Sequence, residues 1–179
     1  MLAHEAAHQL DLERVLLIPV GLAPHRKIDP EPGPEVRLEM VRAGAEGDGL
    51  LEVLDFEVKS SEPSFTFRTL EMLHEERPED EITLLMGADV ATSLGSWKQP
   101  MRVLDLAKVG VAGRPGADFD EAEESLERLG AQDRFETVRM PELGVSSTRI
   151  RRLAAAGRSI RYLVPEPVRT LIEERRLYR

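Results

Sequence analysis

The run I-T-L-L-M-G-A-D occupies residues 82–89. A short apolar run that ends at a glycine is typical of a strand buried on both faces of a parallel sheet. The segments Arg14–Pro19 (R-V-L-L-I-P) and Ala107–Ala112 (A-K-V-G-V-A) have the same character. The sequence therefore predicts three buried strands, with a short helix after Gly87.

Helical and strand-like patterns alternate along the rest of the chain. Longer helices are expected at Leu2–Leu10, Glu35–Glu46, Phe65–Glu76, Phe119–Leu129, Ser146–Ala156 and Pro165–Arg175. Two further strands are expected at Leu51–Val58 and Phe135–Met140. The alternation predicts an α/β fold with a mainly parallel sheet. Ligands bind such sheets at the carboxyl ends of the strands, so the loops of interest follow Ile18, Met86, Ala112 and Met140.

The composition suggests one ordinary domain, expected over residues 1–179. The chain has 179 residues, 41% of them hydrophobic, which is enough for a core. The absence of cysteine excludes disulfide scaffolds, thiolate metal sites and cysteine nucleophiles. A net charge of −9 and an aromatic content of 4% argue against a nucleic-acid partner. Val15–Pro24 is too short to span a membrane and no signal peptide is visible, so we expect a cytoplasmic protein.

A second feature combines a helix start with basic residues. The segment G-V-S-S-T-R-I-R, residues 144–151, follows a predicted strand and opens a predicted helix. Hydroxyl side chains cap helix starts, where the N–H groups and the helix dipole attract anions. Arg151 lies one turn further on and can bind a phosphate. Residues 149–179 hold nine Arg against three Glu. The pattern fits either an anion site or an ordinary capped helix with solvated arginines.

Three other segments place polar or aromatic residues where a ligand could bind. The loop P-V-G-L-A-P-H-R, residues 19–26, leaves a buried strand and ends in a histidine and an arginine. It is either a ligand-binding loop or a plain crossover loop. Gly87 and Asp89 lie in the turn after a predicted strand. This turn either places a carboxylate where ribose hydroxyls often bind or forms a helix N-cap. Trp97, the only tryptophan, lies in a predicted loop between two helices, although a lone tryptophan is usually a core anchor.

His4, Glu5 and His8 form an H-E-x-x-H motif on the first predicted helix. In zinc hydrolases the two histidines bind the metal and the glutamate is a general base. The metzincin extension needs Gly and His where this chain has Asp11 and Arg14. We therefore favour a surface helix and predict no metal site, while a third ligand from another glutamate stays open.

In this order and spacing the segments resemble those of the bacterial nicotinate-nucleotide adenylyltransferases, of the nucleotidyltransferase superfamily. The resemblance covers nearly the whole chain. It rests on L-A-H-E-A-A-H-Q-L, R-V-L-L-I-P-V-G-L-A-P-H-R, E-P-S-F-T-F-R-T-L, L-L-M-G-A-D, S-W, G-R-P-G, V-S-S-T-R-I-R and A-G-R-S-I-R-Y-L-V-P-E-P-V. It implies a Rossmann-like nucleotidyltransferase fold, with helices on both faces of a mainly parallel sheet.

The resemblance also implies an enzyme of NAD biosynthesis. With Mg²⁺, such an enzyme transfers the adenylyl group of ATP to nicotinate mononucleotide, giving deamido-NAD and pyrophosphate. The implied ATP phosphate site consists of Ser146, Ser147, Thr148 and Arg151. The residues implied to lie beside the nucleotides are His25, Arg26, Phe65, Thr66, Gly87, Asp89, Arg114 and Trp97, the last stacked on the nicotinate ring. Chemistry of this kind depends on positioning and charge neutralisation.

The chain departs from the family pattern in three places. The family loop P-P-H-K is A-P-H-R here, at residues 23–26, which keeps the cation. Arg68 stands where the family often has Asp. The family's first strand and its G-x-F-D-P-x-H-x-G-H segment, whose histidines contact ATP phosphates, do not precede Met1. His4 and His8 lie too late to replace them, so no catalytic residue is identified.

The missing first strand leads to an expectation about the start of the chain. In the resembled fold this strand lies between Arg14–Pro19 and Ile82–Met86, and its loss would leave two apolar strand edges unpaired. We expect the natural product to begin about 20 residues earlier. A chain that starts at Met1 is expected to show negligible activity and poor solubility. The sequence predicts no oligomeric state. Three alternatives stay open: a catalytically impaired nucleotide-binding relative, a zinc hydrolase, and a sister enzyme that acts on nicotinamide mononucleotide.

Overall fold

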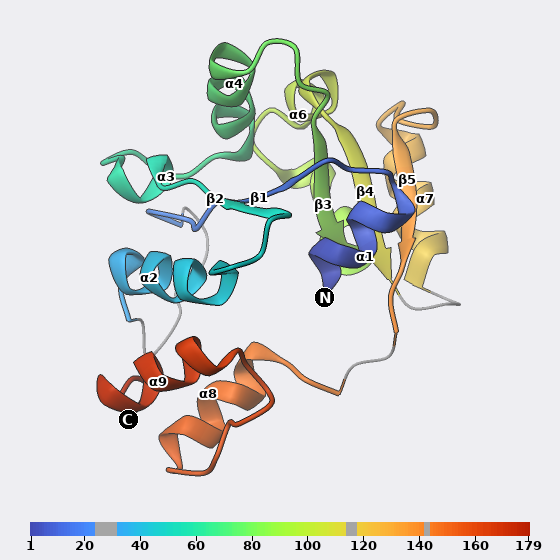
Figure 1. The fold of residues 1–179 in the computed structure, drawn as a ribbon. Coiled ribbons are helices and arrows are strands. Elements are labelled where there is room, and N and C mark those ends of the chain that lie inside the picture. The colour runs from blue at the N-terminus through green and yellow to red at the C-terminus, as the bar shows by residue number, and fades with distance from the viewer. Residues whose placement is uncertain (24–31, 114–117, 142–143) are drawn as a thin grey trace. The chain divides into compact units, whose positions relative to one another are not determined.

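The computed structural model describes residues 1–23, 32–113, 118–141 and 144–179 (Figure 1). The chain divides into two compact units. The first unit comprises Met1–Val15 and Phe65–Glu142, and the second comprises Leu16–Ser64 and Leu143–Arg179. The single domain predicted over residues 1–179 stays a prediction.

The first unit is built on a three-stranded parallel sheet. Its strands are β3 (Thr83–Gly87), β4 (Lys108–Gly113) and β5 (Phe135–Arg139), in the spatial order β3–β4–β5. Leu85 lies opposite Gly110, and Gly110 lies opposite Glu136. The parallel strands predicted from Ile82–Met86 and Ala107–Ala112 are therefore confirmed, with ends that differ from the prediction by one residue. The strand predicted over Arg14–Pro19 is not part of this sheet, because only Val15–Leu17 is a strand and it pairs elsewhere.

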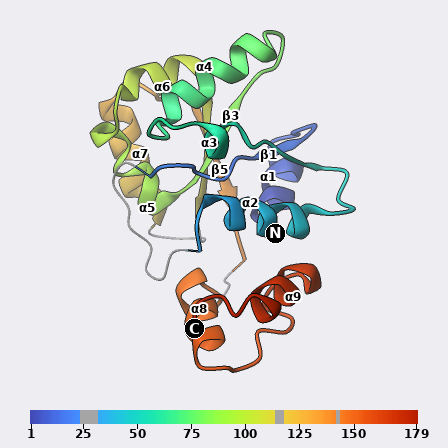
Figure 2. The same ribbon diagram turned by 90° about the vertical axis from the view of Figure 1, so that its left-hand side faces the viewer.

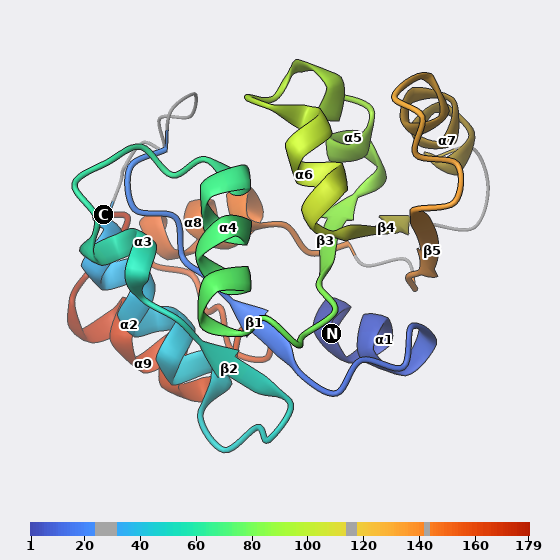
Figure 3. The same ribbon diagram turned by 90° about the horizontal axis from the view of Figure 1, so that it is seen from above.

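Helices cover both faces of this sheet (Figure 3). Helix α1 (Leu2–Gln9) lies on one face, and α5 (Ala88–Ala91), α6 (Pro100–Leu106) and α7 (Asp118–Arg128) lie on the other. The short 3₁₀ helix η1 (Leu94–Ser96) precedes α6, and α4 (Thr66–Glu76) packs against α6. The alternation of side chains along β4 explains these layers. Val109 and Val111 belong to the main core cluster, whereas Ala112 packs with Ala6 of α1.

Two contacts hold α1 close to the sheet. A Cβ atom at Gly110 would lie 2.5 Å from Leu85 Cδ2 and 3.1 Å from Leu10 Cδ1, so the glycine makes room for the chain that covers β4. The Gln9 side chain donates a hydrogen bond to the Arg139 carbonyl and accepts one from the Arg139 N–H, both at 2.9 Å. One amide side chain thereby occupies the backbone donor and acceptor of the last residue of β5.

In the part of the chain that the structure describes, the second unit combines a two-stranded sheet with four helices. Strand β1 (Val15–Leu17) pairs with β2 (Leu51–Val53). Its helices are α2 (Pro34–Ala45), α3 (Phe56–Lys59), α8 (Ser147–Ala155) and α9 (Glu166–Glu174). A loop joins α8 to α9 (Figures 1 and 2), and Ala154 of α8 and Ile172 of α9 belong to the same core cluster. Ala154, Ile160 and Ile172 form the core of the unit, and Met40 of α2 packs against it.

The strand predicted over Leu51–Val58 is wrong in its second half. The strand β2 ends at Val53, and α3 occupies Phe56–Lys59. Asp55 starts this turn, because its carboxylate lies 2.9 Å from the Lys59 ammonium and 2.6 Å from the Arg42 guanidinium. An i, i+4 ion pair of this kind favours the helical turn over the strand.

Candidate functional site

The carboxyl end of β3 carries the predicted pair Gly87 and Asp89. Gly87 is the N-cap residue of α5, with φ −72° and ψ 154°, and Asp89 is exposed in the first turn. A Cβ atom at position 87 would lie 2.5 Å from Asp89 Oδ1. The glycine thus allows the carboxylate to lie against the end of the strand. The turn thus does contain a helix N-cap, at Gly87, and the role of Asp89 beside a ribose stays a prediction.

Aromatic rings and cations gather at the start of α4, also in the first unit. The rings of Phe65 and Phe67 are stacked with their centroids 6.1 Å apart. The Arg68 guanidinium carbon lies 5.9 Å from each centroid, and Lys98 Nζ lies 4.6 Å from that of Phe65. Both cations are exposed, whereas Phe65 is half-buried. The structure therefore places two positive charges over a partly accessible aromatic surface.

Trp97 directly precedes Lys98 and lies between η1 and α6. It is half-buried and packs, like Phe65, against the main core cluster. Thr66 is also half-buried and is the first residue of α4. Trp97 is therefore neither a fully buried anchor nor a fully exposed ring, and its role beside a ligand stays a prediction.

The start of α8 forms the candidate phosphate site in the second unit. Ser146 is the N-cap residue, and its Oγ accepts a hydrogen bond of 3.2 Å from the N–H of Arg149. Ser147 and Thr148 follow as exposed residues of the first turn. Arg151 donates to Thr148 Oγ1 at 3.3 Å, which holds its guanidinium over that turn. The N–H groups of a first helical turn lack acceptors within the helix, so this cluster presents several donors together.

Other arginines of the basic C-terminal segment serve the structure of the second unit. Arg169 of α9 donates to Glu166 at 2.6 Å and also to Glu173. These hydrogen bonds raise the pKa of Arg169 and lower that of Glu166. Arg175 donates to Glu39 of α2 at 2.5 Å. The positive charge predicted from the sequence is thus divided between ion pairs on α9 and the start of α8.

The loop after β1 is anchored where it leaves the strand. The N–H of Gly21 donates to Ser64 Oγ at 3.1 Å, and the Ser64 N–H donates to the Leu22 carbonyl at 2.9 Å. A Cβ atom at Gly21 would lie 2.0 Å from the backbone oxygen of Glu57. Only glycine therefore fits at this position.

Three predicted nucleotide-binding residues, His25, Arg26 and Arg114, lie outside the described residues. Of the others, Phe65, Thr66, Gly87, Asp89 and Trp97 lie in the first unit. Ser146, Ser147, Thr148 and Arg151 lie in the second.

The H-E-x-x-H motif lies on α1, as expected. Within residues 1–23, 32–113, 118–141 and 144–179, no group of three or more His, Asp or Glu side chains could hold a metal ion. The described structure thus offers no third ligand to His4 and His8.

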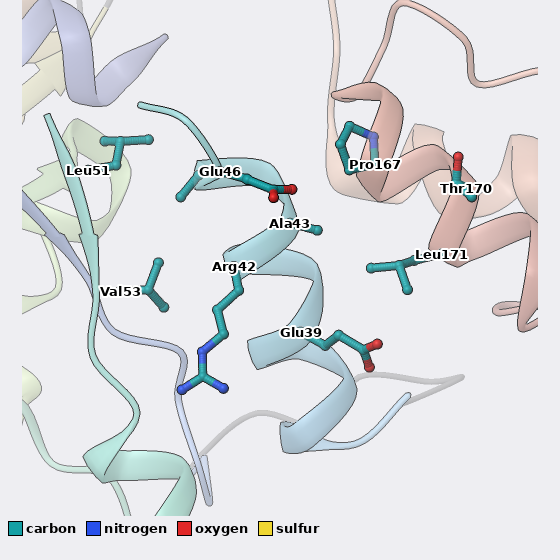
Figure 4. A pocket seen from close by; sticks show the side chains of 10 residues that line it. Glu39, Arg42, Ala43, Glu46, Leu51, Val53, Pro167, Thr170 and Leu171 are labelled. Atoms are coloured by element: carbon teal, nitrogen blue, oxygen red, sulfur yellow. The ribbon is translucent and has the colours of Figure 1, made fainter. Parts of the chain in front are cut away.

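A hollow of about 680 Å³ lies in the second unit, between α2, β2 and α9 (Figure 4). None of the site residues predicted from the sequence lines this hollow. Of its three charged lining residues, Arg42 binds Asp55 and Glu39 binds Arg175. The hollow is therefore not the candidate site.

The sequence did not indicate that Arg68 and Lys98 lie over the ring of Phe65, one of the predicted site residues. Arg68 departs from the family pattern, in which Asp is common at this position, and no motif includes Lys98. A basic residue beside the single tryptophan was the available signal, but its contact with Phe65 depends on tertiary structure.

Comparison with known proteins decides the family. Residues 1–153 match the family model described as Cytidylyltransferase-like. The chain is 40% identical to a probable nicotinate-nucleotide adenylyltransferase of Exiguobacterium sibiricum, over 99% of this chain and 89% of the relative. A protein of the same description from Rubrobacter xylanophilus is 37% identical, over 100% of this chain and 84% of the relative. The chain belongs to the nicotinate-nucleotide adenylyltransferase family.

A solved structure supports the fold of this adenylyltransferase family member. Plasmodium falciparum nicotinic acid mononucleotide adenylyltransferase complexed with NaAD matches with a TM-score of 0.73 at 16% identity, over 98% of this chain and 90% of that one. The predicted nucleotidyltransferase fold is thereby confirmed. Among the described residues, no helix is long and apolar enough to cross a membrane.

Proposed function

We propose that the chain transfers the adenylyl group of ATP to nicotinate mononucleotide, giving deamido-NAD and pyrophosphate. Family membership carries this proposal, because the relatives match over nearly the whole chain at 34–40% identity. The start of α8 supplies the physical support. Its hydroxyls, N–H groups and Arg151 form the donor set that a polyphosphate needs.

In the proposed reaction a 5′-phosphate oxygen of nicotinate mononucleotide attacks the α-phosphorus of ATP. The bond from the α-phosphorus to the bridging oxygen breaks, and pyrophosphate leaves with the electron pair of that bond. No covalent intermediate with the protein is needed. The residues at the start of α8 would hold the phosphates in line and neutralise the charge on the leaving oxygens. The described residues include no group that we assign as a general acid or base.

Mg²⁺ is proposed to enter with ATP. The described side chains form no cluster that could hold a metal ion by themselves. Mg²⁺ usually keeps several waters and binds through phosphates and one or two carboxylates, rather than in an all-protein cage. We therefore treat the magnesium complex of ATP as the substrate and derive no step through a protein-bound metal.

The first unit is proposed to hold the sugar and the pyridine ring. The Asp89 carboxylate, exposed at the end of β3, is suited to accept hydrogen bonds from ribose hydroxyls. Trp97 is proposed to stack on the nicotinate ring, with Phe65 and Thr66 beside it. His25, Arg26 and Arg114 stay candidates on the family resemblance alone. The cytoplasmic location stays a prediction from the sequence, which shows no signal peptide.

The test uses the natural protein, expressed from its own gene, with ATP, Mg²⁺ and nicotinate mononucleotide. Formation of deamido-NAD and pyrophosphate in equal amounts supports the proposal. Binding of both nucleotides without pyrophosphate would instead identify a catalytically impaired relative. Stoichiometric zinc in the purified protein, with neither nucleotide bound, would favour the hydrolase alternative.

A further inference from the structure

The loop between α8 and α9 contains a tight turn over Ile160–Leu163, the Tyr162 turn. A hydrogen bond of 3.1 Å from the Leu163 N–H to the Ile160 carbonyl closes it. Its third residue, Tyr162, has φ +63°. Turns with a positive φ at this position normally have glycine or asparagine there, because a bulky side chain is strained in the left-handed region. Tyr162 therefore occupies a backbone position that disfavours it.

Packing within the second unit does not compensate for this strain, because the Tyr162 side chain is 90% exposed. The base of the turn is fixed, since Ile160 is buried in the core of the unit and Val164 packs against that core. Among the described residues, the Tyr162 ring has one contact of this kind, with the Arg161 guanidinium carbon 5.6 Å from its centroid. An aromatic ring that a strained turn holds in solvent indicates a role in binding rather than in folding.

Basic side chains accompany this ring. Arg158 and Arg161 are exposed and lie in the same loop. Glu166 and Glu173, two of the three glutamates in the basic C-terminal segment, are bonded to Arg169. The Tyr162 turn therefore presents a tyrosine together with positive charge. Tyrosine and arginine are also the residue types that contribute most to binding at the centres of protein interfaces.

Helix α7, in the first unit, carries a surface of the opposite charge. Four exposed acidic side chains lie at the spacing of one helical face and form the acidic face of α7: Asp120, Glu123, Glu124 and Glu127. Ala122 and Leu126, on the other side of the helix, are buried. Among the described residues, the cation that pairs with the acidic face is Arg128, 3.8 Å from Glu124. Like charges four residues apart repel, so a basic surface against this face would relieve the repulsion.

We propose that the Tyr162 turn binds the acidic face of α7 in a second copy of this chain. Charge complementarity selects this partner, because the loop is basic and the face of α7 is acidic. The two surfaces are different parts of one sequence, so the contact joins copies head to tail. The ring lies against the aliphatic parts of the glutamate side chains, and Arg158 and Arg161 pair with their carboxylates. The surface is small, so the association is weak and decreases as salt is raised.

Sedimentation equilibrium of the natural protein, over a range of protein concentrations, measures the association constant. Tyr162→Gly is the decisive variant, because glycine removes the ring and tolerates the positive φ. This variant should lose at least about tenfold in association constant and keep its urea midpoint. Arg161→Gln should weaken association up to about fivefold. Arg152→Gln is the matched control, because Arg152 is an exposed arginine of α8, and it should leave the association constant unchanged.

Mixing two defective variants tests the partner surface. Glu123→Lys combined with Glu127→Lys removes much of the acidic face and should also prevent association. The Tyr162→Gly variant keeps the acidic face, and the lysine variant keeps the Tyr162 turn. A mixture of the two should therefore associate, although neither variant does so alone.

The opposite results overturn the proposal. A natural protein that stays monomeric at every concentration and salt, association that survives Tyr162→Gly, or a mixture that fails to associate would exclude this interface. A lower urea midpoint for Tyr162→Gly would show that the ring serves the fold. Binding of a single-stranded oligonucleotide that Tyr162→Gly abolishes, without self-association, would assign the turn to nucleic acid instead.

Discussion

Substitution of Gly87 by alanine tests the geometry at the end of β3. A Cβ atom there would lie 2.5 Å from Asp89 Oδ1, too close for the carboxylate to keep its position. The backbone at Gly87 is extended, at φ −72°, so alanine is compatible with the main chain. The nearest atom is the end of an exposed side chain, which can rotate away. The substitution therefore moves one carboxylate and little else.

The expected effects on stability and on binding differ in size. Replacing glycine by alanine stabilises by about 0.4–1 kcal/mol through the unfolded state. Moving Asp89 off its preferred rotamer costs about 0.5–1.5 kcal/mol. The free energy of unfolding should therefore change by less than about 1 kcal/mol. Loss of a hydrogen bond from a ribose hydroxyl to a charged carboxylate costs about 1.5–3 kcal/mol, so nucleotide affinity should fall at least about tenfold.

The assay combines calorimetric titration of ATP and of nicotinate mononucleotide with urea denaturation. Gly49→Ala serves as the control, because a Cβ atom at Gly49 meets nothing within 4 Å. Asp89→Asn completes a double-mutant cycle. If the alanine acts by displacing Asp89, the two losses should not add. Unchanged affinity for both nucleotides, or fully additive losses, would refute the reasoning.

Three further predictions follow from single contacts. Arg151→Ala should weaken ATP binding by about 1.5–3 kcal/mol. Arg152→Ala, which removes the same charge from the same helix, should leave ATP binding unchanged. Equal losses of ATP affinity in calorimetry would count against Arg151 as a phosphate-binding residue. Gly21→Ala should lower the free energy of unfolding by about 1–3 kcal/mol through overpacking against backbone, and an unchanged urea midpoint would contradict this. The hydrogen bond from Lys59 lowers the pKa of Asp55 below its ordinary 3.8, so its stabilisation is present above about pH 4 and is lost as pH falls through the lowered pKa. Asp55→Asn should flatten the acid dependence of the unfolding midpoint, and an unaltered profile would exclude this pair as a contributor.

The parts of the fold that depend on local sequence were predictable. The apolar runs gave β3 and β4 within one residue. Residues 109–112 of β4 are buried, as a continuous apolar run predicts, whereas in β3 only Met86 is buried. Segments in which two local tendencies compete were not predictable from the sequence. The alternation of Leu51–Val58 suggested one strand, but the ion pairs of Asp55 with Lys59 and Arg42 favour a helical turn.

In the candidate site, too, local contacts were predictable from the sequence and contacts between distant segments were not. The cap at Ser146 joins residues three positions apart, so the sequence motif was sufficient to predict it. The contact of Thr148 with Arg151 is equally local, but the motif suggested only that Arg151 could bind a phosphate. The cations over Phe65 could not be predicted, because Lys98 comes from a different element. The pairing of Gln9 with the backbone of β5 likewise depends on how distant segments meet.

Transfer of a labelled adenylyl group tests the central claim most directly. The natural protein is incubated with Mg²⁺, nicotinate mononucleotide and ATP carrying radioactive phosphorus at the α-position. The account predicts that the label appears in a dinucleotide with the mass of deamido-NAD, with one pyrophosphate released per dinucleotide and none when the mononucleotide is omitted. Label that stays in ATP, or that is released as AMP, would contradict the account.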